Sequence, residues 1–295
     1  MKARDYSKPY RVTNGKKFRL DDIDPDETRW VNNEDEAADL LKEGIDVLSD
    51  LQEKLYAHDR WALLLVFQAM DAAGKDGTIK HVMSGVNPQG VDVSSFKQPS
   101  QEELDHDYNW RTHTQLPERG RIGIFNRSYY EETIVVRVHK AYLEGERIPE
   151  RLVTPDIWKE RYEDINAFER YASRNGIAIR KFFLHVSKDE QRKRFLKRIE
   201  EPSRNWKFSM GDVRERAHWD DYMTAYEDTI RHTATPHAPW YVVPADHKWF
   251  TRLVVAAAVI DALDEMNLEY PKVDAAKKRE LAEARRLLHA EKKDR

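Results

Sequence analysis

Hydrophobic positions along the chain follow two different spacings. From Ala37 to Leu55, apolar residues recur every three or four positions, which predicts one amphipathic helix after a polar N-terminal arm. Shorter apolar runs follow and predict five strands, at Leu63–Phe67, Val91–Phe96, Ile122–Phe125, Ile177–Val186 and Trp240–Val243.

Helical patterns separate these strands. They are expected at about 75–84, 101–115, 129–142, 155–174, 187–200, 212–232 and 249–266. Three helix ends carry signals of their own, namely Thr154 before Pro155, Gly176, and Ser187 with Glu190 three residues later. Strands that alternate with helices predict βαβ units and a mostly parallel sheet covered on both faces. The charged segment 275–295 has helical propensity, and its pattern fits either a solvated helix or a contact between subunits.

Composition predicts a globular chain with a charged exterior. The 295 residues are 40% hydrophobic and 35% charged, and no apolar run reaches the roughly 18 to 20 residues of a membrane span. The first thirty residues lack the apolar core of a signal peptide, so a cytoplasmic location is expected. The chain has no cysteine, which excludes disulfides and thiolate chemistry. We expect an arm over 1–34, one α/β domain over 35–270 and a charged tail over 271–295.

Positive charge is concentrated in one segment of this acidic chain. The net charge is -3, yet residues 188–216 contain ten Lys/Arg and six Asp/Glu. Such a segment can attract polyanions, or it can be a solvated helix with ion pairs along its surface.

A loop typical of phosphate-binding sites follows the first predicted strand. Residues 61–80 read WALLLVFQAMDAAGKDGTIK, which combines a buried strand, small residues, a Gly-Lys pair and a helix start. The P-loop (Walker A) pattern is G-x-x-x-x-G-K-[ST], but Ala69 and Asp76 occupy its first and last positions. Lys75 at the helix start can pair with phosphate oxygens, unless the segment is an ordinary turn with a surface lysine. Asp71 inside such a loop would repel phosphate unless it holds a metal ion or accepts a proton.

A second candidate element ends the third predicted strand, where residues 121–132 read RIGIFNRSYYEE. Ligands of α/β nucleotide-binding folds lie beyond the carboxyl ends of the strands, so this segment is expected to meet the loop. Asn126 stands where an acidic residue would usually help to hold magnesium. Arg127 offers a planar fork suited to phosphate oxygens, although it could instead pair with the neighbouring glutamates.

Six segments together resemble the polyphosphate kinase 2 family, in the family's order and over about Asp35 to Leu268. They are QAMDAAGKDGTIK, SFKQPSQEELDHDYNWR, GIFNRSYYEETIVVRVH, SRNWKFS, WDDYMTAYEDTI and PWYVVPADHKWF. The resemblance implies a P-loop kinase-like α/β fold similar to thymidylate kinases, with a five-stranded parallel sheet between helices and a helical lid over about 187–215. It also implies reversible phosphoryl transfer between inorganic polyphosphate and a nucleotide, with Mg²⁺ or Mn²⁺.

The same resemblance implies roles for individual residues. The catalytic candidates are Asp71, Lys75, Asn126 and Arg127, with Asp71 as the metal ligand. The candidates for phosphate or polyphosphate binding are Ala72, Ala73, Gly74, Lys75, Asp76, Gly77, Lys80, Arg127, Arg194, Arg198, Arg204 and Lys207. The candidates for nucleotide binding or acceptor selection are Glu131, Trp110, Arg111 and Arg137. Glu131 after NRSYY and Asn126 in place of aspartate look like the members that accept both AMP and ADP.

The expected partners are inorganic polyphosphate and adenine or guanine nucleotides, with neither nucleic acid nor a membrane, in a homodimer or homotetramer. Two alternatives remain at this point. An ATP-dependent nucleoside monophosphate kinase would share the fold but would normally keep the full P-loop, which Ala69 and Asp76 break. A non-catalytic polyanion-binding protein would explain the basic segment but not Asp71.

Overall fold

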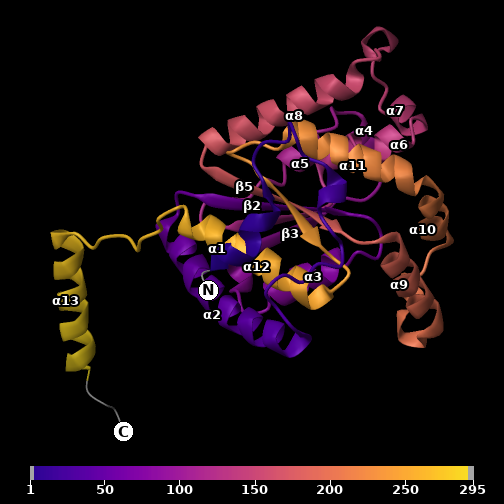
Figure 1. The fold of residues 1–295 in the computed structure, drawn as a ribbon. Helices are drawn as coiled ribbons and strands as arrows, with labels where there is room; N and C mark the ends of the chain where they lie inside the picture. Colours follow the sequence, from indigo (N-terminus) through magenta and orange to yellow (C-terminus); the bar gives the residue numbers. More distant parts are fainter. Residues whose placement is uncertain (1–2, 292–295) are drawn as a thin grey trace.

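A six-stranded sheet forms the centre of the protein, which we describe from a computed structural model over residues 3–291 (Figure 1). The strands are β1 (Arg11–Val12), β2 (Ala62–Ala69), β3 (Val91–Ser95), β4 (Ile122–Asn126), β5 (Ile177–His185) and β6 (Trp240–Pro244). Their order is β1-β6-β5-β2-β4-β3. Strands β2 to β6 are parallel, which confirms the five predicted strands. The sheet has six strands rather than five because β1, from the N-terminal arm, adds two residues antiparallel to β6.

Helices cover both faces of the sheet. The α-helices are α1 (Ala3–Ser7), α2 (Glu34–His58), α3 (Lys75–Val82), α4 (Gln101–Leu104), α5 (Trp110–His113), α6 (Val135–Val138), α7 (Ala141–Gly145), α8 (Ile157–Arg174), α9 (Lys188–Glu200), α10 (Met210–Glu215), α11 (Trp219–Thr233), α12 (Lys248–Asp264) and α13 (Ala275–Ala290). Short 3-10 turns are η1 (Lys8–Tyr10), η2 (Leu20–Asp22), η3 (Pro88–Gly90), η4 (Tyr129–Glu132), η5 (Glu150–Leu152), η6 (Pro202–Lys207) and η7 (Arg216–His218). Helices α2, α3 and α12 lie on one face of the sheet, and α8 and α11 lie on the other (Figure 1).

Strand β2 lies in the middle of the sheet and is covered by helices on both faces. All eight of its residues are buried, and it pairs with β5 on one side and β4 on the other. A strand that is covered on both faces has a continuous apolar sequence, such as LLLVF from Leu63 to Phe67. The carboxyl end of β2 therefore opens at the middle of the sheet edge, between β4 and β5.

Three predicted helices are interrupted. The pattern at 101–115 becomes α4 and α5, because the Asp107 carboxylate accepts a hydrogen bond from the Asn109 N–H at 2.9 Å and forms a turn between them. The pattern at 129–142 becomes η4, α6 and α7, and the pattern at 212–232 divides into α10, η7 and α11. The helix-end signals are confirmed at Gly176, which has φ 86°, and at Ser187, whose Oγ accepts from the Glu190 N–H at 3.1 Å.

A buried polar cluster joins the sheet to the segment that follows β4. The Lys181 Nζ on β5 lies 2.7 Å from the carboxylate of Glu169 on α8, and both side chains are fully buried. Tyr129 and Tyr130 donate hydrogen bonds to the same carboxylate at 2.9 and 2.7 Å. A buried ion pair needs such additional hydrogen bonds to offset its desolvation. The cluster holds η4 against α8 and so limits where Arg127 and Glu131 can lie.

The two ends of the chain differ in their packing. The N-terminal arm lies on the body, where Tyr10 is buried and donates a hydrogen bond to Glu27 at 3.0 Å. Every residue of α13 is exposed, and α13 stands away from the rest of the molecule (Figure 1). Residues 292–295 of the predicted tail lie outside the described part of the chain. Within residues 3–291, no helix combines the length and the apolar character that crossing a membrane requires.

Candidate active site

The β2–α3 loop, residues 70–74, connects the central strand to α3. Ala72 has φ 62° and Gly74 has φ 112°, so both adopt the left-handed region, which glycine tolerates easily and alanine does not. The chain thereby folds back so that the Lys75 Nζ donates a hydrogen bond to the Ala69 carbonyl at 2.8 Å. Burial lowers the pKa of Lys75, and the nearby charge of Asp71 opposes that shift. A partly desolvated lysine at a helix start is well placed to receive an anion.

The end of β4 lies directly beside this loop. Asn126 on β4 is in register with Phe67 on β2, and the Arg127 N–H donates to the Phe67 carbonyl at 3.0 Å. The Asn126 amide donates to the Asp76 carboxylate at 2.8 Å, and the Arg127 guanidinium donates to Asp71 at 3.2 Å. The expected meeting of the two motifs is therefore present, because parallel neighbours end at the same edge of the sheet.

A cavity of about 510 Å³ opens over these side chains, and we call it the cationic cavity. Its lining is Met70, Asp71, Ala72, Gly74, Lys75, Asp76, Gly77, Ser95, Phe96, Lys97, Asn126, Arg127, Arg198 and Lys207. Five cationic side chains thus face two carboxylates. Ten of the predicted site residues line this cavity. Arg198 and Lys207 come from α9 and η6, so the basic segment does reach the loop.

Arg194, which the sequence predicts to bind phosphate, is not among the residues that line this cavity. Its side chain is 7% exposed and donates to the carbonyls of Ala72 and Ala73 at 3.1 and 2.7 Å. It also donates to the carbonyls of Ala245 and Asp246 at 2.6 and 2.9 Å. The guanidinium therefore ties the β2–α3 loop to the loop after β6, and its donors are used by the protein itself.

Two further residues at the site, Gln191 and Lys97, were not predicted from the sequence. The Gln191 side chain donates to the Asp71 carbonyl at 2.8 Å and accepts from Arg216 at 2.7 Å, so α9 holds the loop at a second point. Lys97, after β3, lines the cationic cavity, and the Arg111 guanidinium donates to its carbonyl at 2.7 Å. Lys97 could have been predicted from its place after β3, a strand that neighbours β4. No feature of the sequence pointed to Gln191.

A second cavity of about 160 Å³ lies on the other side of Asp71 and Arg127, and we call it the tyrosine cavity. Its lining is Ala69, Met70, Asp71, Arg127, Glu131, Val135, His139, Tyr142, Glu215, Tyr222 and Tyr226. Burial raises the pKa of Glu131, while Arg127 and Lys75 act to lower it. The Glu215 carboxylate on α10 lies 2.8 Å from His139 and accepts from the Tyr222 hydroxyl at 2.7 Å. The two cavities share Met70, Asp71 and Arg127.

The remaining predicted residues lie outside both cavities. Ala73, within the loop, is buried, and Lys80 is exposed on α3. Arg204 is partly exposed and forms an ion pair with Glu201. Trp110 stacks on His106 with ring centroids 4.1 Å apart. Arg137 donates to Asp228 at 2.6 Å and to the Tyr162 hydroxyl at 2.7 Å, which leaves its guanidinium engaged beside the site rather than in it.

The donor set at Asp71 fits a divalent cation that is shared with a substrate. Within the described residues, no group of three or more acidic or histidine side chains could hold a metal ion on its own. Mg²⁺ is commonly bound through one or two carboxylates together with substrate phosphates. The Asp71 side chain is 32% exposed and lines both cavities, so it meets this requirement.

Comparison with known proteins shows a consistent relationship over most of the chain. The family model described as Polyphosphate kinase 2 (PPK2) matches residues 31–271. An ADP-polyphosphate phosphotransferase of Rhodopseudomonas palustris is 49% identical over 96% of this chain and 98% of its own length. An AMP/ADP-polyphosphate phosphotransferase of Meiothermus ruber is 44% identical over 91% of this chain and 97% of its own length. The crystal structure of polyphosphate kinase 2 from Arthrobacter aurescens superposes with a TM-score of 0.85 at 40% identity, covering 94% of this chain and 96% of that one.

Proposed function

Because the chain belongs to the polyphosphate kinase 2 family, we propose that it transfers phosphoryl groups between inorganic polyphosphate and AMP or ADP. The reaction forms ADP from AMP and ATP from ADP, and it is reversible. The observation that carries this proposal is the pair of cavities that meet at Asp71 and Arg127. One cavity is cationic and includes Arg198 and Lys207 of the basic segment in its lining, and the other is small and lined by tyrosines. A polyanionic donor and a nucleotide acceptor can thus approach one point from two sides.

The cationic cavity suits the polyphosphate chain. Five cationic side chains line it, namely Lys75, Lys97, Arg127, Arg198 and Lys207. Each phosphate unit of the chain carries negative charge, so these side chains neutralise the donor and the charge that develops on transfer. Arg194 and Gln191 fasten the first half of α9 to the β2–α3 loop. Closure of a lid over the polyphosphate therefore involves the protein segment from Arg198 onward.

The transfer requires little general base catalysis. A non-bridging oxygen of the acceptor phosphate attacks the terminal phosphorus of the chain, and the phosphoanhydride bond to the next phosphate breaks. The shortened polyphosphate leaves with the electron pair of that bond. Because the acceptor phosphate is already anionic at neutral pH, no strong base has to create the nucleophile. Arg127 and Asp71 orient the reacting phosphates where the cavities meet.

The magnesium ion is part of the same proposal. Asp71 would hold it together with phosphate oxygens, and the ion would neutralise charge on the transferring group. Asn126 is committed to Asp76 by its hydrogen bond at 2.8 Å. The carboxylate of Asp76 is thereby held at the rim of the cavity, at the position where a P-loop has its hydroxyl.

The tyrosine cavity suits the nucleotide acceptor. Its walls are aromatic at Tyr142, Tyr222 and Tyr226, which can contact a nucleoside. Glu131 and Glu215 would repel additional phosphate groups, which favours an acceptor with a short phosphate tail over a long polyanion. Assignment of the donor to one cavity and of the acceptor to the other follows from this difference in charge.

The experiment is a donor exchange with purified protein and magnesium. Polyphosphate is supplied with AMP, ADP, GMP or GDP in turn, and the products are separated by charge. We expect ATP from ADP and polyphosphate with no other donor. Asp71→Asn should lower turnover by about two orders of magnitude or more while polyphosphate still binds, because one negative charge near the polyanion is lost.

Asp92→Asn is the matched control. Its side chain is 56% exposed and pairs with Arg121 at 3.3 Å, outside both cavities, so turnover should remain at the wild-type level. If the protein phosphorylates AMP from ATP and leaves polyphosphate untouched, it is a nucleoside monophosphate kinase instead. If Asp71→Asn turns over normally, Asp71 has no part in the mechanism.

A further inference from the structure

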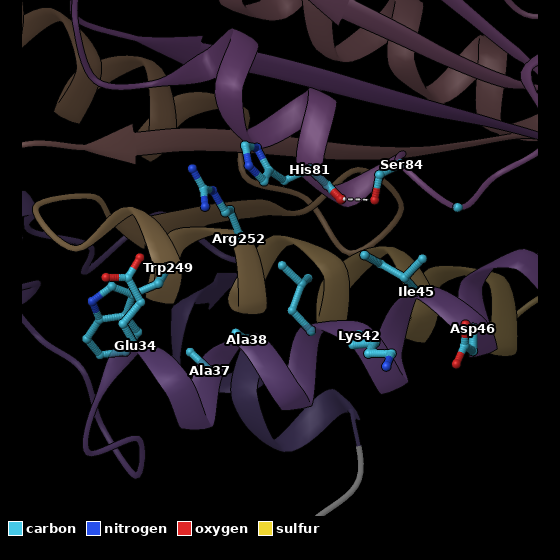
Figure 2. Close-up of a pocket in the computed structure, with 12 residues that line it drawn as sticks. Glu34, Ala37, Ala38, Lys42, Ile45, Asp46, His81, Ser84, Trp249 and Arg252 are labelled. Carbon is cyan, nitrogen blue, oxygen red and sulfur yellow. Dashed lines mark hydrogen bonds between the residues drawn. The ribbon is translucent and has the colours of Figure 1, made fainter.

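A groove of about 350 Å³ runs along α2 and shares no lining residue with either cavity of the candidate active site. One wall is a single face of α2, formed by Glu34, Ala37, Ala38, Leu41, Lys42, Ile45 and Asp46. The opposite wall is formed by His81 of α3, by Ser84 and Gly85 just after α3, and by Trp249 and Arg252 of α12 (Figure 2). The α2 face spans about 18 Å, since a helix rises 1.5 Å per residue. Its floor is apolar, and Leu41, Ile45 and Trp249 are only half-buried.

Helix α13 has the complementary features of an amphipathic helix without a surface to cover. Leu281, Ala284 and Leu288 recur at spacings of three and four, so they lie on one face of α13. Leu281 and Leu288 are 51% and 66% exposed. They lie about 10 Å apart along the helix, which is shorter than the α2 groove. Helices of this kind bind apolar grooves through anchors at such spacings.

Charge also matches the two elements. Helix α13 contains five Lys/Arg and two Asp/Glu, whereas α2 contains eight Asp/Glu and two Lys. Asp35, Asp39 and Glu43 are exposed on α2 beside the groove. Opposite charge on the two helices would guide their encounter and set their orientation.

We infer that α13 of one copy of this chain docks into the α2 groove of a second copy, as a reciprocal helix exchange between subunits. Within the single chain, α13 finds no surface, because all of its residues are exposed and it stands away from the body (Figure 1). Pro271 follows Tyr270 in the connection and favours an extended chain there, which projects α13 outward. In a two-fold arrangement each copy donates one helix and one groove, so both contacts form at once.

Disulfide cross-linking between two separately prepared variants tests this inference. The natural chain contains no cysteine, so an introduced cysteine reports one position. Full-length Ala38→Cys and full-length Ala284→Cys are mixed at equal concentration and oxidised slowly. Both positions are exposed, so neither variant removes core packing. We expect a covalent heterodimer to form rapidly, and to form more slowly at high ionic strength because the opposite charges are screened.

Matched controls isolate the groove and the leucine face. Val47→Cys places a cysteine on α2 outside the groove, at a position that is 47% exposed, and should cross-link slowly with Ala284→Cys. Adding Leu281→Glu and Leu288→Glu to Ala284→Cys should slow the reaction with Ala38→Cys by about tenfold or more, since both leucines lose their burial. Adding Ala282→Glu and Ala290→Glu changes the charge equally on another face of α13, so it should slow the reaction only by the effect of charge, and the leucine variant should be slower than this control by about tenfold.

Two results would overturn the inference. Equal rates for Ala38→Cys and Val47→Cys would mean that the helix meets α2 only by random collision. The second is an absence of heterodimer in the mixture, together with an internal disulfide in a chain that carries both Ala38→Cys and Ala284→Cys. That result would mean that α13 folds back on its own subunit.

Discussion

Replacement of Arg194 by alanine should destabilise the fold and the β2–α3 loop together. The guanidinium makes five hydrogen bonds, to the Glu190 carboxylate and to the carbonyls of Ala72, Ala73, Ala245 and Asp246. These partners lie in three different segments, and the side chain is 7% exposed. Truncation would leave four carbonyls and one carboxylate without their donor in a region that water reaches poorly.

The size of the effect follows from this network. A hydrogen bond that involves a charged group contributes about 1.5 to 3 kcal/mol, but bonds made by one side chain are not additive. Breaking a buried charged network by removing one partner typically costs about 3 to 5 kcal/mol, and we expect Arg194→Ala to fall in that range. Arg194→Lys keeps the charge but loses the planar fork that reaches both loops, so a loss of about 1 to 3 kcal/mol is expected.

Urea denaturation of the full chain measures the free energy of unfolding. Arg192→Ala is the control on the same helix, because its side chain is 62% exposed and pairs with Asp189 at 3.4 Å. An exposed pair of this kind should change stability by only about 0 to 1 kcal/mol. In kinetic assays, Arg194→Lys should lower kcat and leave the KM for polyphosphate within about twofold, because the guanidinium does not line the cationic cavity.

The opposite pattern would refute this reasoning. If Arg194→Ala unfolds at the wild-type urea concentration but raises the KM for polyphosphate, then Arg194 contacts the substrate, as its sequence alone suggested. The same result would show that the loop does not depend on Arg194 for its position.

Three other perturbations test separate parts of the structure. Arg198→Ala and Lys207→Ala should raise the KM for polyphosphate and change the free energy of unfolding by about 0 to 1 kcal/mol, whereas wild-type kinetics at low salt would remove both from the substrate path. Burial lowers the pKa of His185 from 6.5 to about 4, so this neutral histidine contributes stability above pH 6.5 that is lost as the pH falls toward 4. Between pH 6.5 and pH 4, the free energy of unfolding of wild type should fall by about 3 kcal/mol more than that of His185→Asn, as measured by urea denaturation. An equal dependence of the two free energies on pH would contradict the lowered pKa of His185. Glu169→Gln should lower the free energy of unfolding by about 3 to 5 kcal/mol because Lys181 remains buried without its counter-charge, and an unchanged urea midpoint would show that the pair is dispensable.

The five parallel strands and the β2–α3 loop were predictable from the sequence because their signals are local. A continuous apolar run such as Leu63–Phe67 reports burial on both faces, and the small residues before Lys75 report a tight turn into a helix. The approach of Asn126 and Arg127 to the loop was also predictable, because a general property of parallel sheets places it there. Membership of the family was visible in the six segments and their order, and the family model matches residues 31–271.

Helix interruptions were not predictable from periodicity alone. The apolar spacing at 129–142 suits a helix, but the hydroxyls of Tyr129 and Tyr130 reach the buried Glu169, which is 39 or more residues away in the sequence. That contact exists only after α8 has packed, and it overrides the local preference of the segment.

Only the tertiary structure decided which basic side chains face the substrate cavity. Arg194 and Arg198 are four residues apart on one helix, so the sequence placed both on a common face. In the fold, the carbonyls of Ala72, Ala73, Ala245 and Asp246 surround the end of Arg194, while Arg198 reaches the cavity. The tyrosine cavity also depends on distant segments, because His139 follows α6, whereas Glu215 and Tyr222 belong to α10 and α11. Periodicity and motifs report what each segment needs to bury, whereas the partner that satisfies a buried charge comes from a distant segment and is known only once the chain has folded.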